Sequence, residues 1–256
     1  MIDCIKVALQ LYSVRDDGQH DMEGTLRKVR EMGYEGVEFA GLYGHTPEQI
    51  RAWIKEIKLE PVSAHVDINE LNKNLQQVID IYKTIGCPYI AVPWLDVAQR
   101  PGTSGFEQTK KELNSIAAEC EKQGMTLLYH NHDFEFAKIN GEYGFDILFK
   151  EIPALQTEID TCWVKAAGED PAAYLRRYTN RAPVVHLKDF AFKKQQDISE
   201  KIEFHPLGYG IQDIPSLIKA AQDAGTDWVV VEQDDPGSEL SQMECARKSM
   251  EFLKTL

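Results

Sequence analysis

The sequence contains no apolar run that approaches the roughly 20 residues of a membrane-spanning helix. Its first residues, MIDCIKVALQLYSVR, also lack the basic segment and unbroken apolar core of a secretory signal, because Asp3, Lys6 and Gln10 interrupt them. Cysteine is scarce, and the chain has no CxxC pair. The five cysteines are Cys4, Cys87, Cys120, Cys162 and Cys245. This odd, scattered set predicts reduced thiols in a cytoplasmic protein rather than a disulfide framework or a zinc ribbon, and no membrane partner is expected.

Positively charged residues are also fewer than negatively charged ones. The chain has 28 Lys and Arg residues against 41 Asp and Glu residues, which gives a formal net charge of −13. Such an acidic surface repels a phosphate backbone, so nucleic acid is not an expected partner. A glycine-rich phosphate turn is missing as well, because the first predicted strand ends in LQLYSVR without a GxGxxG motif.

What the chain does contain is a regular alternation of short β-rich runs and longer amphipathic stretches. The predicted strands are Lys6–Ser13, Gly36–Ala40, Pro61–Asp67, Tyr89–Leu95, Thr126–Asn131, Leu155–Asp160, Ala182–Asp189 and Trp228–Asp234. The predicted helices are Thr25–Met32, Pro47–Ile57, Leu71–Ile85, Phe106–Gln123, Pro171–Tyr178, Ile214–Ala224 and Gln242–Leu253, with a less regular one near Phe145–Ile152. Eight βα units predict a single-domain (β/α)8 TIM barrel over residues 1–256. A doubly wound open sheet is the alternative, but it more often has fewer strands and a glycine-rich first turn.

Polar side chains gather late in these strands, where (β/α)8 barrels carry their active sites. They are Gln10 and Tyr12, Glu38, His65 and Asp67, His130 and His132, Glu158 and Asp160, His186 and Lys188, and Glu232 and Asp234, with Trp94 in the fourth strand. The paired residues are two apart and therefore share a face of their strand. A single histidine at a strand end is often structural, and Glu38 or Asp67 could cap the following helix. The repetition over seven strands instead predicts one shared site.

A cation at the centre of that site would offset the cost of burying its ionisable groups, which is on the order of several kcal/mol for each unpaired group. Carboxylates and imidazoles without paired thiolates suit Mn²⁺, Co²⁺, Zn²⁺ or Mg²⁺, and the acid-rich mixture favours Mn²⁺. We therefore predict one divalent metal ion. Cys162, close to Asp160 in the sequence, is not included among the expected ligands.

Several segments together resemble the sugar phosphate isomerase/epimerase group of the xylose-isomerase-like superfamily, over nearly the whole chain. They are LQLYSVR, GYEGVEFAG, YHNHDFEF, EIDTCW, VVHLKDF, the PLGYG turn followed by Asp213, and VVVEQD. The resemblance implies one divalent metal held by residues from the fifth to the eighth strand. Asp160, His186 and Glu232 match the last three ligands.

The fifth strand departs from the pattern of the group. Many of its epimerases have a glutamate in an LEPxN-like segment, where this sequence has His130. His130 is the expected fourth ligand, with His132 or Glu135 as alternatives. Those epimerases use two metal-bound glutamates on opposite faces of the substrate, so the change disfavours symmetric epimerisation. The HxH cluster is similar to that of inosose dehydratases of this superfamily.

The resemblance implies a sugar isomerase or epimerase that removes a proton next to a carbonyl through a metal-stabilised enediolate. A lyase acting on an inosose or a 3-keto-glycoside is the alternative. Glu232 is the expected base, and the candidates for the complementary acid are Lys188, His65 and His132. The expected substrate contacts are Gln10, Glu38, Trp94, Glu158 and Trp163, although Glu158 could instead orient a metal ligand.

Two other protein classes share this superfamily. A DNA repair endonuclease would need additional metal ligands and a basic groove, which the charge of −13 disfavours. A sugar-binding barrel without catalysis would have lost metal ligands, whereas three positions match. The expected partner is a small sugar or cyclitol, and the sequence leaves homo-oligomer formation open.

Overall fold

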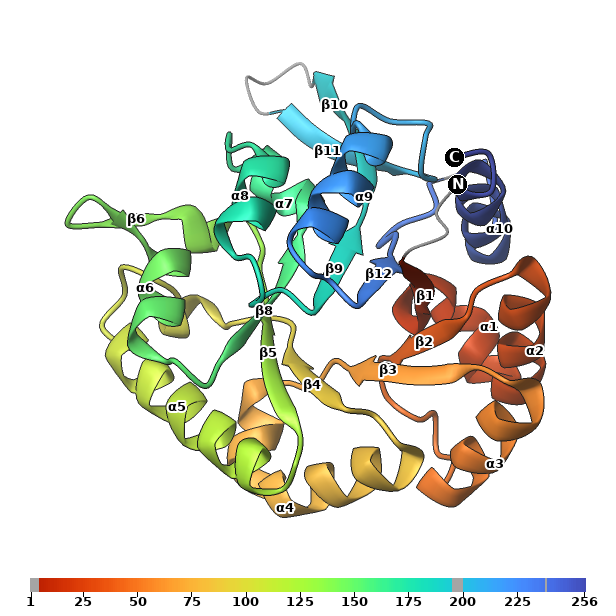
Figure 1. Cartoon of the computed structure of the whole chain (residues 1–256), viewed down its shortest axis with the longest axis horizontal. Helices are drawn as coiled ribbons and strands as arrows, with labels where there is room; N and C mark the ends of the chain where they lie inside the picture. Colours follow the sequence, from red (N-terminus) through yellow and green to blue (C-terminus); the bar gives the residue numbers. More distant parts are fainter. Residues whose placement is uncertain (1–4, 195–199, 238) are drawn as a thin grey trace.

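The computed structural model describes residues 5–194, 200–237 and 239–256, and their main feature is a barrel of parallel strands (Figure 1). The eight strands are hydrogen-bonded in the order β3-β2-β1-β12-β9-β8-β5-β4. They are β1 Lys6–Gln10, β2 Gly36–Phe39, β3 Glu60–Ala64, β4 Tyr89–Val92, β5 Thr126–His130, β8 Gln156–Asp160, β9 Val184–Leu187 and β12 Trp228–Val231. The ring closes beyond β3, where His65 forms a parallel bridge with Ala91 and the Val66 N–H donates to the Ala91 carbonyl at 2.9 Å. The predicted (β/α)8 barrel is confirmed.

Helices surround the strands on the outside (Figure 1). They are α1 Arg15–His20, α2 Met22–Met32, α3 Pro47–Ile57, α4 Ile68–Ile85, α5 Phe106–Lys122, α6 Gly144–Glu151, α7 Thr161–Ala166, α8 Pro171–Arg177, α9 Ile214–Asp223 and α10 Gln242–Leu253. Short 3₁₀ turns occupy Leu11–Val14, Val97–Gln99 and Phe134–Phe136. Within the described ranges, none of the helices has the length and apolar character needed to cross a bilayer.

The boundaries of the helices follow local chemistry. At the start of α3, the Thr46 side chain accepts a hydrogen bond from the Gln49 N–H, and the Gln49 side chain accepts one from the Thr46 N–H. Pro47 occupies the first turn. Helices α2 and α4 end at Gly33 and Gly86, whose φ angles of 108° and 109° favour glycine. These signals are why the predicted helix ends lie within a few residues of the observed ones.

Several predicted strands are too long, and some elements were not predicted. The first strand ends at Gln10 rather than Ser13, because the Gln10 side chain accepts the Tyr12 N–H and starts a 3₁₀ turn. Helices α1 and α7 are each six residues long and too short for a periodic pattern. Two antiparallel hairpins also lie outside the barrel, β6 Lys138–Ile139 with β7 Glu142–Tyr143 and β10 Asp189–Lys194 with β11 Glu200–His205.

The interior of the barrel changes from apolar to ionisable along its axis. Its apolar part consists of Ala8, Val62, Ala91, Leu128, Val184, Trp228 and Val230. Two positions further along three strands, Leu128 is followed by His130, Val184 by His186 and Val230 by Glu232. Because side chains two apart share a face, these ionisable groups lie above the apolar layer, at the C-terminal end of the barrel.

The PLGYG segment, residues 206–210, wraps around the buried carboxylate of Asp189. That carboxylate accepts backbone N–H bonds of 2.9 to 3.0 Å from Phe190, Gly208, Gly210 and Gln212. A Cβ atom at Gly210 would lie 2.2 Å from Asp189 Oδ1, so only glycine fits there. The motif that appears in the sequence as a loop signature therefore holds the chain before α9 against the end of β9.

Candidate metal centre

Four buried side chains from neighbouring strands converge at the C-terminal end of the barrel. They are His130 on β5, Asp160 on β8, His186 on β9 and Glu232 just after β12, and we call them the quartet. One donor atom from each lies within 4.8 Å of the other three. Two imidazoles and two carboxylates fit a divalent ion such as Zn²⁺ or Mn²⁺. The structure thus brings together the four residues that the sequence predicted as metal ligands, and their ligand role stays a prediction.

Asp160 is fixed by the start of the helix that follows it. Its Oδ1 accepts the backbone N–H groups of Cys162 and Trp163 at 2.8 and 3.1 Å, which caps α7. Its Oδ2 points the other way and lies 3.3 Å from Nε2 of His130. The Lys188 ammonium outweighs burial and lowers the pKa of Asp160, so this carboxylate is ionised. Burial lowers the pKa of His130 to about 4, and its imidazole is therefore neutral, as a metal ligand must be.

The Asn131 side chain connects the ends of β5 and β8 and was not singled out from the sequence. Its Oδ1 accepts the Asp160 N–H at 2.9 Å, and its Nδ2 donates to the Asp160 carbonyl at 3.3 Å. Its position between His130 and His132 indicates a side chain on the opposite face of the strand, which is the signal that could have revealed it. Asn131 sets the relative position of two quartet members without belonging to the quartet.

His186 lies between two carboxylates. Its Nδ1 is 2.9 Å from Oε2 of Glu232, and its Nε2 is 2.6 Å from Oε2 of Glu38. Burial by itself would lower the pKa of His186, but the charges of Glu38, Glu158 and Glu232 outweigh it and hold that pKa well above the usual range. With the Nε2 hydrogen donated to Glu38, Nδ1 is the nitrogen available to a metal ion in the quartet.

Glu38 and Glu158 form a deeper group with His65. Nε2 of His65 lies 2.6 Å from Oε2 of Glu158 and 3.2 Å from Oε1 of Glu38. Both carboxylates have no exposed surface, and neither lines the cavity at the mouth of the barrel. The structure therefore places Glu38 and Glu158 beneath that cavity, rather than at the substrate-contacting positions predicted from the sequence.

The Lys188 ammonium contacts two members of the quartet. Its Nζ lies 3.2 Å from Oδ2 of Asp160 and 2.9 Å from Oε2 of Glu232, and it also contacts Asp234 at 3.0 Å. Burial would lower the pKa of Lys188, but these three carboxylates, Asp160 first, raise it well above the usual range. A metal ion bound by the quartet would contact the same Asp160 and Glu232 carboxylates as the Lys188 ammonium. Lys188 would keep Asp234 as a further partner.

The mouth of the barrel holds a cavity of about 440 Å³ above the quartet. It is lined by Tyr12, Ala40, His65, Pro93, Trp94, His130, His132, Lys188, Glu232 and Asp234. Trp94 is 41% exposed and forms one wall, with its ring in edge contact with His132 at a centroid distance of 4.6 Å. The Arg100 guanidinium stacks on both Trp94 and Phe134, at 4.4 and 3.8 Å, and fixes this wall.

Other predicted site residues lie elsewhere. Gln10 is buried and serves the turn after β1, while Trp163 packs 5.0 Å from the ring of His132 and does not line the cavity. Glu135 points away from the quartet, because its carboxylate accepts from the Tyr129 hydroxyl at 2.5 Å and from the His132 N–H at 2.7 Å. Of the three candidates for the strand-five ligand, His130, His132 and Glu135, only His130 is in the quartet.

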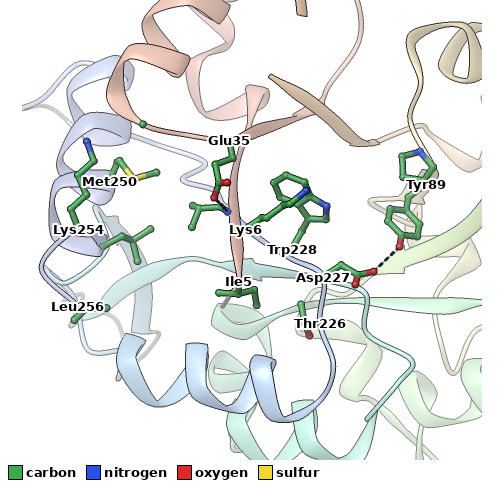
Figure 2. A pocket seen from close by; sticks show the side chains of 14 residues that line it. Ile5, Lys6, Glu35, Tyr89, Thr226, Asp227, Trp228, Met250, Lys254 and Leu256 are labelled. Carbon is green, nitrogen blue, oxygen red and sulfur yellow. Dashed lines mark hydrogen bonds between the residues drawn. The ribbon is translucent and has the colours of Figure 1, made fainter. Parts of the chain in front are cut away.

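A larger cavity, of about 910 Å³, lies at the opposite end of the barrel (Figure 2). It surrounds Lys6, Tyr89 and Trp228, the first residues of β1, β4 and β12. Its polar groups include Asp227, which accepts a hydrogen bond from the Tyr89 hydroxyl at 3.1 Å. None of the predicted site residues lines it, whereas several of them line the smaller cavity.

The sequence of this barrel matches a known family. The sequence fits the xylose isomerase-like TIM barrel family over residues 26–256. The chain belongs to this family. It is 23% identical over 245 residues to an inosose dehydratase of Geobacillus kaustophilus (strain HTA426), a match that covers 85% of this chain and 78% of the relative.

Solved structures of xylose isomerase-like barrels superpose on nearly the whole chain. A sugar phosphate isomerase/epimerase from Parabacteroides distasonis has a TM-score of 0.80 at 20% identity, and the match covers 98% of this chain and 94% of that one. The IOLI protein with a bound zinc atom has a TM-score of 0.77 at 14% identity, covering 98% and 97%. At this level of identity the agreement concerns the fold.

Proposed function

We propose that this member of the family is a divalent-metal-dependent lyase that removes water from a keto-sugar or keto-cyclitol. The observation that carries the proposal is the distribution of charge around the mouth cavity. Its two carboxylates, Glu232 and Asp234, both follow β12, and among the described residues that line the cavity the other ionisable groups are imidazoles, the Tyr12 hydroxyl and the Lys188 ammonium. A carboxylate base facing a cationic acid suits elimination better than proton exchange on both faces of a substrate.

The quartet is the proposed metal site of the enzyme. A divalent ion held there would supply positive charge beside the substrate oxygens, which makes a neighbouring C–H bond more acidic. The two carboxylates and the neutral imidazole of His130 are already in the form that binds metal, and His186 becomes so on losing its Nδ1 proton. The zinc atom of the IOLI protein supports a metal in this fold, while the identity of the ion here is left to experiment.

Glu232 is the proposed base. It lines the cavity, and although burial would raise its pKa, the charges of Lys188 and His186 hold that pKa well below the usual range. Glu232 is therefore ionised and able to accept a proton from the substrate carbon. The Lys188 ammonium is shared between Glu232 and Asp234, whose two oxygens lie 3.2 and 3.0 Å from Nζ.

Lys188 is the proposed acid that protonates the departing hydroxyl. It stays charged, lines the cavity and lies 2.9 Å from Glu232, so the base and the acid can act on adjacent carbons. His132 is a poorer candidate, because burial, with the neighbouring His130 and Lys188, lowers its pKa to about 2 and leaves the ring neutral. His65 is protonated but donates to Glu158.

The flat wall formed by Trp94 suits the apolar face of a sugar or cyclitol ring. A cavity of about 440 Å³ accommodates a single ring. The similarity to inosose dehydratases supports a keto-cyclitol and favours the lyase over the isomerase predicted from the resemblance alone.

Product analysis after incubation in deuterated water tests the proposal. The metal-loaded enzyme, incubated with keto-inositols and keto-sugars in deuterated water, should release a dehydrated product, and Glu232→Gln should abolish turnover. Glu239→Gln changes an exposed glutamate nearby and should leave turnover unaltered. A product that keeps its water and has a shifted carbonyl would instead identify an isomerase. Wild-type turnover by metal-loaded Glu232→Gln would exclude Glu232 as the base.

A further inference from the structure

The imidazole of His132 is enclosed by aromatic rings at the edge of the mouth cavity. The rings of Trp94 and Trp163 lie at centroid distances of 4.6 and 5.0 Å from it. Phe134 stacks on it at 5.5 Å, with an angle of 6° between the two planes, and His130 makes an edge contact at 5.2 Å. These neighbours hold the His132 ring in one orientation, because a rotated ring would collide with them.

The two ring nitrogens of His132 have different surroundings. Nδ1 is buried and has no hydrogen-bond partner among the described residues. The ring lines the mouth cavity, and Nε2 is not buried in this way, so Nε2 is the nitrogen that a bound molecule reaches. A proton on Nδ1 would be a buried N–H group without an acceptor, which is unfavourable. The ring is therefore expected to carry its proton on Nε2 and to leave Nδ1 as an acceptor.

Trp163 supplies a donor that suits this acceptor. Its Nε1–H is also buried and has no partner among the described residues. An indole N–H can only donate, and an unprotonated imidazole nitrogen can only accept, so the two groups complement each other. Ring centroids 5.0 Å apart and a tilt of 33° leave room for an N–H···N bond of about 3 Å between the ring edges.

The fold fixes Trp163 in this place through its backbone. Its N–H donates to Oδ1 of Asp160 at 3.1 Å in the first turn of α7, directly after β8. Strand β8 is paired with β5, the strand that ends at His130, so the start of α7 lies beside the segment that carries His132. The indole face also lies 5.6 Å from Nζ of Lys188.

We propose that Trp163 is a positioning residue whose Nε1–H donates to Nδ1 of His132, so that the His132 proton stays on Nε2 and is donated to an oxygen of the substrate. A neutral imidazole can polarise a carbonyl or bind a hydroxyl in this way without transferring its proton. The substrate contact rests on the proposed function, whereas the position of the His132 proton does not. His132 thereby receives a binding role in place of the acid role considered from the sequence.

Long-range proton–nitrogen NMR on the full chain with isotopically labelled histidine tests the position of the proton, with Mg²⁺ as a diamagnetic ion. The wild type should show an unprotonated Nδ1 and a protonated Nε2 for His132, identified by the signals that His132→Gln lacks. Trp163→Phe removes the indole N–H but keeps an aromatic face beside Lys188. In this variant His132 should become a mixture of both tautomers.

Trp53→Phe is the matched control. Trp53 lies on α3 and makes an edge contact with His45 at a centroid distance of 4.8 Å. The variant therefore changes a tryptophan beside another histidine, away from the mouth cavity, and should leave the His132 signals as they are in the wild type.

Calorimetric titration with an inosose tests the contact with the substrate. His132→Phe keeps a ring but has no N–H, and it should bind the inosose about 3- to 10-fold more weakly, the usual effect of losing one uncharged hydrogen bond. His132→Gln places an amide N–H near the position of Nε2 and should recover most of this affinity. In the wild type, the Nε2 signal should shift when the inosose is added.

The outcomes separate this inference from the proposed function. A protonated Nδ1 in the wild type would overturn the tautomer and with it the role of Trp163. An unchanged tautomer in Trp163→Phe would overturn the role of Trp163 alone. Equal affinity of His132→Phe and wild type would overturn the substrate contact. A wild type that binds no inosose would overturn the proposed keto-cyclitol and the contact to it, while the NMR result would still decide the tautomer.

Discussion

Nδ1 of His186 lies 2.9 Å from Oε2 of Glu232, although 46 positions separate the two residues in the sequence. The contact arises because β9 and β12 are neighbouring parallel strands in which Val230 is in register with His186. Glu232 is two residues beyond Val230 and lies on the same face. This pairing, repeated on β5 and β8, is what gives the quartet its compact geometry.

The first prediction concerns His130, the residue that departs from the epimerase pattern. His130→Ala removes one of the four quartet donors and should weaken Mn²⁺ binding at the quartet by at least about 100-fold, since outer-shell changes alone cost about 10- to 100-fold. The metal-free variant should melt within about 5 °C of the metal-free wild type. Calorimetric titration with Mn²⁺ and thermal unfolding measure the two effects.

A distant histidine provides the control for that experiment. His45 packs against Trp53 outside the barrel mouth, so His45→Ala should leave Mn²⁺ affinity unchanged. Normal affinity in His130→Ala together with a large loss of stability would assign His130 a structural role.

The second prediction concerns the Asp189 loop. Asp189→Asn replaces one acceptor oxygen by a donor amide, which leaves two of the four backbone N–H groups without a partner. The cost should be about 1 to 3 kcal/mol for each group left unsatisfied. Urea unfolding should show the loss as a lower midpoint.

Asp170 is the matched control, because it also accepts two backbone N–H bonds, from Ala172 and Ala173, at an exposed helix start. Asparagine caps helices about as well as aspartate, so Asp170→Asn should change the unfolding free energy by less than about 0.5 kcal/mol. Equal losses in the two variants would contradict the role assigned to Asp189.

The third prediction concerns the pH dependence of stability at Glu135. Burial raises the pKa of this carboxyl to about 8, whereas a glutamate in the unfolded chain titrates near about 4.3. The folded state therefore binds the proton more tightly, and its stability should fall as pH rises from about 4 to about 8. Glu135→Gln removes this titration.

The unfolding free energy of Glu135→Gln relative to wild type should accordingly rise by up to about 1.4 kcal/mol per pH unit across that window. Denaturant unfolding of both proteins at about pH 5 and about pH 8 measures the difference. Glu31→Gln, at an exposed position on α2, should follow the wild type at both pH values. A constant difference between Glu135→Gln and wild type would mean that Glu135 is ionised in the folded protein throughout.

Much of the fold could be predicted because its signals are local. Helix caps, helix-stop glycines and strands of apolar residues are set by neighbours in the chain, which is why eight strands and the helices between them were predicted close to their observed places. The period of two then predicted which polar residues face the barrel interior. His130, Asp160, His186 and Glu232 belong to that larger set, and the resemblance to the sugar phosphate isomerase/epimerase group predicted them as the metal ligands; the structure brings the four together.

Depth within the barrel was decided only by the tertiary structure. Gln10, Glu38 and Glu158 share the strand-end pattern of the quartet, yet they lie below or beside the cavity, because the stagger between strands sets the height of each side chain and leaves no mark in a single strand. Glu135 is three residues from His132 but turns away, since the Tyr129 hydroxyl and the His132 N–H satisfy it on the other side. The sequence by itself determined which residue types face inward. The packing of eight strands into one ring determined which of them line the mouth cavity, which converge in the quartet, and which support their neighbours.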